Sequence, residues 1–78
     1  TSFMALGSLP VDDLKELLQP EEISLGGDYD TLGGLVLNYA GHIPKEGYSF
    51  QLENYKFTVK EVINKRIKKV LLERLPSE

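Results

Sequence analysis

The chain has 78 residues, 41% of them apolar and 27% charged, with a formal net charge of −3. This composition is typical of one small globular domain and unlike a disordered segment, and the acidic balance argues against bulk attraction to nucleic acid. The lack of cysteine excludes disulfides, thiolate metal sites and cysteine catalysis. No apolar run approaches the roughly 20 residues of a transmembrane helix. Because the chain begins with Thr1 rather than methionine, we expect a single domain over 1–78, excised from the C-terminus of a longer membrane protein.

The first half of the chain predicts a strand followed by two helices. The apolar run at 3–6 fits a short strand. A helix is expected over 10–20, because proline suits its first position and a second proline ends it. The second helix starts at Asp30 or Thr31, either of which can cap its free N–H groups, and stops at Gly41. Each helix carries apolar residues at the spacing of one buried face: Val11, Leu14, Leu17 and Leu18, then Leu32, Leu35, Val36, Tyr39 and Ala40.

From residue 48 onward the apolar period changes to two, which indicates strands. We expect three of them, over 48–53, 55–60 and 66–75, joined by turns near Asn54 and at Asn64-Lys65. The predicted class is therefore α+β, in the order strand-helix-helix-strand-strand-strand. Two helices pack on one face of a small antiparallel sheet, and the lysine-rich face meets water.

The sequence offers no catalytic constellation, so we expect a protein without enzymatic activity. His42 directly follows the helix-ending glycine and has no visible partner, which favours an exposed or helix-capping role over that of a general base. The serines occur in no nucleophile-elbow pattern. We also expect no metal site, because the two acidic groups have the spacing of no ordered calcium loop: Asp12, Asp13 and Glu16, then Glu21, Glu22, Asp28 and Asp30.

Two features invite a binding interpretation. The pair Gly33-Gly34 lies inside the second helix, where glycine costs about 1 kcal/mol relative to alanine. A phosphate cradle, a close packing contact or a hinge would each explain it, and we favour packing because the flanking residues match no phosphate-binding motif. The basic residues Lys65, Arg66, Lys68 and Lys69 indicate either the solvated edge of a sheet or a contact for an acidic partner, an anionic ligand or a membrane surface. We favour the solvated edge.

The segments "GSLPVDDLKELL" and "DYDTLGGLVLNYAGHIPKEGYSFQLENYKFTVKEVINKRIKKVLL" resemble the CorC/HlyC transporter-associated domain. The family patterns P-V-D-D-L, D-Y-D-T-L-G-G-L-V, G-x-I-P-x-x-G, F-x-V and R-I-x-x-V all recur, over nearly the whole chain. Leu6 departs from a frequent aspartate, and Glu53-Asn54 replaces a frequent Asp-Gly turn.

The resemblance implies a cytoplasmic domain of bacterial membrane proteins that also carry a transmembrane domain and a pair of CBS domains. Such proteins are described as hemolysins or as magnesium and cobalt efflux proteins. We therefore expect a non-catalytic regulatory or interaction domain that contacts those domains or a second copy of itself. A hemolysin acting alone is disfavoured, because both predicted helices use their apolar faces for the core.

A second hypothesis also follows from the resemblance, because the related fold is associated with FAD binding. The domain would then sense FAD or another adenine nucleotide. Five residues would form the site, with the helix N-terminus as the anion-binding element: Gly33, Gly34, Lys65, Arg66 and Lys68.

Overall fold

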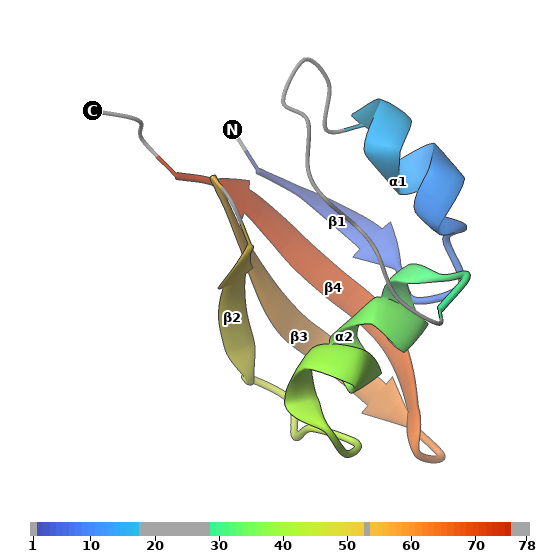
Figure 1. Ribbon diagram of the computed structural model, residues 1–78. Helices are drawn as coiled ribbons and strands as arrows, with labels where there is room; N and C mark the ends of the chain where they lie inside the picture. The colour runs from blue at the N-terminus through green and yellow to red at the C-terminus, as the bar shows by residue number, and fades with distance from the viewer. Residues whose placement is uncertain (1, 18–28, 53, 76–78) are drawn as a thin grey trace.

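Two helices cover one face of a four-stranded antiparallel sheet in the computed structural model, which describes residues 2–17, 29–52 and 54–75 (Figure 1). This arrangement confirms the predicted α+β class and element order. The elements are β1 (Ser2–Leu6), α1 (Val11–Leu17), α2 (Leu32–Ala40), β2 (Ser49–Leu52), β3 (Tyr55–Ile63) and β4 (Arg66–Arg74). The predicted end of the first helix at residue 20 lies outside the described residues.

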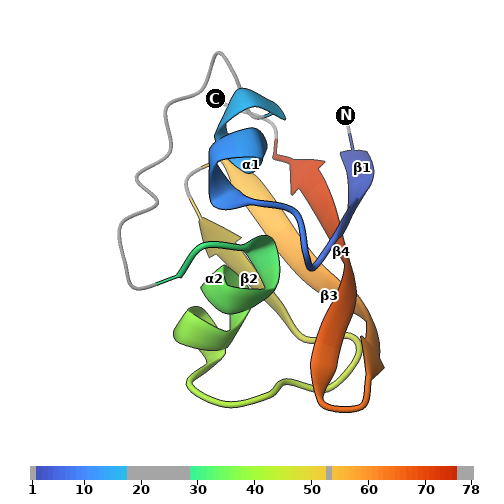
Figure 2. The ribbon, with the colours of Figure 1, turned by 90° about the vertical axis from the view of Figure 1, so that its right-hand side faces the viewer.

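The strands lie in the order β1-β4-β3-β2. Strands β2, β3 and β4 form the expected meander, in which Phe57 pairs with Phe50 on one side and with Leu72 on the other. Strand β1 pairs antiparallel with the free side of β4, so the first strand of the chain becomes an edge of the sheet (Figure 2). The two helices fall between β1 and β2 in sequence, and the chain crosses the sheet over one face.

The core lies between this face and the helices. Its largest fully buried side chains come from the helices and the two central strands: Leu14, Leu32, Leu35, Val36, Phe57, Val59, Val70 and Leu72. Both predicted helical stripes were wrong at one end, because Leu17 is 53% exposed and Tyr39 is 45% exposed. Tyr39 stacks on Phe50 at 4.7 Å between ring centroids, at the margin of the core. Leu17 ends a helix of seven residues beside the edge strand, where no described strand continues the sheet beneath it.

A short antiparallel contact ties the starts of the two helices together. Val11 N donates to Asp30 O at 2.8 Å, and Leu32 N donates to Leu9 O at 2.9 Å, on either side of the bridge between Pro10 and Thr31. These bonds hold residues 9–11, at the start of α1, beside residues 30–32, at the start of α2. This contact holds the N-terminus of α2 against the residues that follow β1.

An irregularity in the β3–β4 pairing determines which residues of β4 are exposed, including two lysines. Val59 pairs with Val70 and Glu61 with Lys69, but Val62 pairs with Ile67, so the register shifts twice. As a result Ile67 and Val70 are both buried although three positions apart, and two adjacent lysines between them are exposed. Strict alternation could not have predicted this arrangement.

The turn between β3 and β4 carries a conformational cost that one substitution removes. Asn64 and Lys65 both have positive φ, at 51° and 64°. Asparagine tolerates this region, whereas lysine costs about 1 kcal/mol there and glycine does not. We expect Lys65→Gly to raise the free energy of unfolding by about 1 kcal/mol, measured by urea denaturation. Asn64→Gly serves as the control with a smaller gain, and a loss of stability in Lys65→Gly would contradict the interpretation.

Candidate functional site

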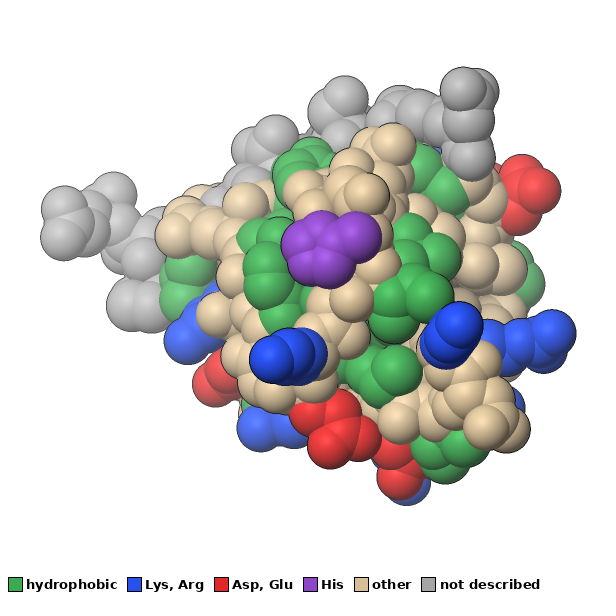
Figure 3. Space-filling view, turned by 90° about the horizontal axis from the view of Figure 1, so that it is seen from below, with side chains coloured by type: hydrophobic (Ala, Val, Ile, Leu, Met, Phe, Trp, Pro, Cys, Tyr) green, Lys and Arg blue, Asp and Glu red, His purple; other side chains and the backbone are tan. Residues whose placement is uncertain are grey.

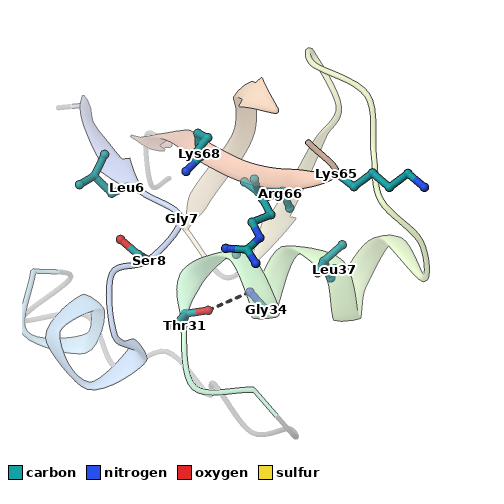
Figure 4. Close-up of a pocket in the computed structure, with 11 residues that line it drawn as sticks. Leu6, Gly7, Ser8, Thr31, Gly34, Leu37, Lys65, Arg66 and Lys68 are labelled. Carbon is teal, nitrogen blue, oxygen red and sulfur yellow. Dashed lines mark hydrogen bonds between the residues drawn. The ribbon is translucent and has the colours of Figure 1, made fainter. Parts of the chain in front are cut away.

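A pocket of about 430 Å³ lies between the first turn of α2, the loop after β1 and the start of β4 (Figure 4). All five residues predicted as a nucleotide site line it, although they come from segments some thirty residues apart. The described residues that line it are Leu6, Gly7, Ser8, Thr31, Gly33, Gly34, Leu37, Lys65, Arg66, Ile67 and Lys68. The β3–β4 turn and the loop after β1 bring these residues together, and the sequence alone gave no signal for Gly7 or Ser8.

The pocket is positively charged. Figure 4 shows the Arg66 guanidinium reaching from β4 toward Gly34, with Lys68 on the side of Gly7. The ammonium group of Lys65 points away from this space. The lining contains no carboxylate. Because the N-terminus of a helix is itself a positive partial charge, a cation directed toward it makes the pocket more attractive to an anion.

The glycine pair permits close packing at this point. Gly33 N donates to Gly7 O at 2.8 Å, and a Cβ on Gly33 would lie 3.1 Å from that same oxygen. A Cβ on Gly34 would lie 3.0 Å from the Cβ of Tyr29. Both distances are shorter than side chains normally accept, so the packing interpretation of the pair is confirmed.

The backbone N–H groups in the first turn of α2 are already bonded within the chain. Leu32 and Gly33 donate to carbonyls of the loop after β1, and Leu35 donates to Thr31 O at 2.9 Å. Gly34 N donates to Thr31 Oγ1 at 3.2 Å, so Thr31 is the N-cap. An anion in the pocket would therefore meet the side chains of Arg66 and Lys68 rather than free amides.

The Thr31 cap gives a direct test of this local structure. Thr31→Ala removes the acceptor of the Gly34 amide and should lower the free energy of unfolding by about 1 kcal/mol. Thr31→Ser keeps the acceptor oxygen and should lose much less. Urea denaturation of the two variants measures the difference, and equal losses would show that the methyl group rather than the hydroxyl stabilises the helix start.

Tyr29 packs against α2 next to the pocket and is neutral at physiological pH. Desolvation, with a smaller contribution from nearby Tyr39, raises the pKa of its hydroxyl above the ordinary value of 10.0. Because the folded-state pKa is raised, this group stabilises the fold below its unfolded-state pKa. The contribution is lost only as the pH rises through the raised folded-state value.

The described part of the chain shows no cluster of metal-ligand side chains. His42 is exposed after the end of α2. Among the described residues no three His, Cys, Asp or Glu side chains gather as metal ligands, and no polar or charged side chain is buried. Glu21, Glu22 and Asp28 of the second acidic group lie outside the described residues. No described helix has the length and apolar character that crossing a membrane requires.

Three large apolar side chains are exposed on the second half of α2 and just after it, and one of them, Leu37, also lines the pocket. Leu37, Tyr39 and Ile43 are 36%, 45% and 40% exposed. Figure 3 shows hydrophobic side chains on both sides of His42 on this face. Single exposed apolar residues are common in soluble domains, whereas larger contiguous apolar patches occur at interaction sites. Sequence periodicity had assigned Tyr39 to the core and so missed its exposure.

Comparison of the sequence with known proteins matches nearly the whole chain to one family. The profile of the CorC_HlyC family, described as a transporter associated domain, matches residues 1–76. The polyamine export protein of Salmonella typhimurium is 34% identical over 77 residues, which are 99% of this chain and 17% of that protein. The chain thus spans about a sixth of the length of this relative.

Solved structures agree with the profile. The transporter associated domain of a Xylella fastidiosa hemolysin, in complex with Mg²⁺ and Mn²⁺, superimposes with a TM-score of 0.85 at 35% identity, covering 96% of this chain and 89% of that one. A Neisseria meningitidis region described as associated with a Mg²⁺ and Co²⁺ transporter gives 0.81 at 26% identity, covering 95% and 89%.

Proposed function

The chain belongs to the CorC_HlyC family of transporter-associated domains, and we propose that it is a non-catalytic regulatory domain of a cation-export protein. The observation that carries this proposal is the match of the family over residues 1–76, together with a polyamine exporter that is about six times longer than the matched segment. The cargoes named for the relatives, polyamines and the divalent ions Mg²⁺ and Co²⁺, are all small cations. Transport of small cations is what these names share, and export is named for the polyamine relative.

In this proposal the domain is the C-terminal part of a membrane protein and lies on the cytoplasmic side. It contacts the CBS pair and the transmembrane domain of the same protein. The exposed group Leu37, Tyr39 and Ile43 supports such a contact, because most of a relative's length lies outside the matched segment and a domain in isolation leaves these side chains in water.

Export assays on the full-length parent protein test the role. Cells that express the parent with and without this domain are loaded with a polyamine, with Mg²⁺ or with Co²⁺, and the efflux of each cation is followed. We expect deletion to change the efflux of one cargo while the protein still reaches the membrane. Ile43→Glu, at a position outside the pocket lining, should reproduce the change, whereas the exposed Lys56→Glu on the opposite face of the sheet should not. Unchanged efflux and assembly after deletion would refute a regulatory role.

One observation favours a second candidate function, the sensing of an adenine nucleotide such as FAD. Gly33, Gly34, Lys65, Arg66 and Lys68 line a single pocket that is large enough for part of such a ligand and has no carboxylate in its lining. Arginine and lysine together bind phosphate groups well, the first as a planar fork and the second as a point charge. Arg66 and Lys68 would then hold the phosphates.

Thermal unfolding with and without FAD, ATP and AMP tests this candidate. A ligand at about 100 times its dissociation constant stabilises the fold by roughly 2.7 kcal/mol, which moves the midpoint of so small a domain by several degrees. Arg66→Ser should abolish the shift, whereas Lys65→Gly should keep it, because the Lys65 side chain points out of the pocket. Gly34→Leu is unsuitable, since its side chain would collide with Tyr29. A midpoint unaffected by every nucleotide would rule out this function and leave the regulatory role untouched.

A further inference from the structure

Strand β1 presents an open edge of the sheet. The order β1-β4-β3-β2 leaves no described strand on its outer side (Figure 2). Its ladder with β4 includes the bond from Gly7 N to Lys68 O at 2.9 Å and continues with Ala5 opposite Val70. In an antiparallel ladder the bonded residues alternate with residues whose N–H and C=O point away from the partner strand. Met4 therefore directs both of its backbone groups to the open edge.

Within the described residues, this edge lacks three of the devices that usually protect such a strand: charge, proline and a bulge. The sequence of β1, Ser-Phe-Met-Ala-Leu, contains no charged residue and no proline, and its pairing with β4 has no bulge. Met4 and Leu6 are 51% and 58% exposed, although they are large and apolar. An uncharged, regular edge of this kind is competent to pair with another strand.

A groove of about 370 Å³ runs beside the same strand and indicates what can occupy it. It is lined by residues 4–6 of β1, by Leu9 and Pro10, and by Leu17 of α1, with Ser8 as the one polar side chain in the lining. A charged segment would find no opposite charge here, so the groove fits an uncharged apolar strand. Strand β1 of another copy has this uncharged, mostly apolar chemistry.

We propose that two copies of this chain pair through β1 in antiparallel orientation, which joins two four-stranded sheets into one. The twofold axis passes between the two Met4 residues, and Ser2 of each copy lies opposite Leu6 of the other. This register satisfies the outward backbone groups of both Met4 residues and sets no like charges opposite each other. Because the axis is perpendicular to the sheet, the α1 helices of both copies lie on the same face, where the exposed Leu17 side chains approach each other. The pairing does not depend on which cation the parent protein exports.

Two other occupants would lead to different assemblies. Pairing of β1 with β2 (Ser49–Leu52), the opposite edge of another copy, is head-to-tail and produces open chains rather than dimers. A strand from a different protein would leave the isolated domain monomeric. Each arrangement makes its own prediction for cross-linking.

Cysteine cross-linking reads the register directly, because the chain has no cysteine of its own. In the proposed dimer the two Cα atoms at position 4 are about 5.5 Å apart, which is within the range of a disulfide. Those at position 6 are four residues out of register, about 13 Å apart. We expect Met4→Cys to form a covalent dimer at least tenfold faster than Leu6→Cys or Ser49→Cys under mild oxidation. Equal rates for the three variants would overturn the proposal, as would faster coupling of Met4→Cys to Ser49→Cys in a mixture.

Sedimentation velocity on the cysteine-free chain supplies the second readout. The unmodified chain should show a dimer whose fraction rises with concentration, and Met4→Lys should shift it to monomer. Ser49→Lys adds the same charge at the other edge and should leave the dimer intact. Thermal unfolding midpoints close to that of the unmodified chain show that both variants fold. A chain that stays monomeric up to sub-millimolar concentration overturns the proposal.

Discussion

Gly7→Ala is expected to be strongly destabilising. A Cβ on Gly7 would lie 1.9 Å from the carbonyl oxygen of Ile67, a backbone atom that no rotamer change can move. Relief requires β1 to separate from β4, which breaks the bond from Gly7 N to Lys68 O and weakens the bond from Gly33 N to Gly7 O. We expect a loss of about 4 kcal/mol, from the overpacking together with the broken hydrogen bonds. The total stability of a domain this size is about 4–12 kcal/mol.

The matched control is Gly41→Ala, which meets no steric clash but places alanine at a positive φ. Gly41 ends α2 with a φ of 78°, and no atom lies within 4 Å of a Cβ placed there. Its replacement therefore carries only the conformational cost of the left-handed region, about 1 kcal/mol. Urea denaturation monitored by circular dichroism compares the two variants. If Gly7→Ala lost no more stability than Gly41→Ala, the strand pair would be far more yielding than the structure indicates.

Gly7 illustrates what the sequence could not predict. As a sequence feature it was a break after an apolar run, whereas its role depends on β4, which is sixty residues away in the chain. Local patterns predicted the class, the element order, the meander and a turn near Asn64-Lys65, although β3 runs to Ile63 rather than ending at residue 60. Each of these depends on residues close together in sequence. The position of β1 at the far edge of β4 depends on long-range pairing, and no local pattern encodes it.

The candidate site shows the same division. The residues Gly33, Gly34, Lys65, Arg66 and Lys68 were identified from the glycine pair and from a run of charge, and the structure places all five around one pocket. The state of the α2 amides could not be predicted, since their acceptors Gly7 O and Leu9 O belong to another segment. The direction of each basic side chain was also hidden, because the β3–β4 register shift breaks the alternation that would have predicted it.

Local sequence patterns also could not predict that Leu17 and Tyr39, on the apolar faces of the two helices, are exposed. Periodicity assigns a face to each residue but not the point at which the layer beneath ends. Leu17 and Tyr39 lie on the predicted faces, beyond the margin of the core. These two misplaced residues belong to the surfaces on which the two interaction proposals depend.

Phe57→Ala is expected to be as destabilising as Gly7→Ala, by creating a cavity rather than a collision. Phe57 is fully buried at the centre of the sheet, between Phe50 on β2 and Leu72 on β4. Its ring stacks on Phe50 at 5.1 Å between centroids, with 14° between the planes, and Phe50 in turn stacks on Tyr39. The aromatic row therefore runs from the core to the surface. Removing its inner ring should lower the free energy of unfolding by about 4 kcal/mol, since three strands and two helices cannot all close on the space.

Two variants separate the cavity from the stacking. Phe57→Leu keeps most of the volume and should lose about 1.5 kcal/mol, whereas Tyr39→Ala removes the exposed outer ring and should lose about 1 kcal/mol. Urea denaturation ranks the three variants, and the near-ultraviolet circular dichroism of the remaining aromatic rings reports whether packing around Phe50 survives. A Phe57→Ala variant as stable as Tyr39→Ala would mean that the core repacks around the missing ring. The sheet would then depend on its backbone pairing, with Gly7 as its most sensitive position, more than on the aromatic row.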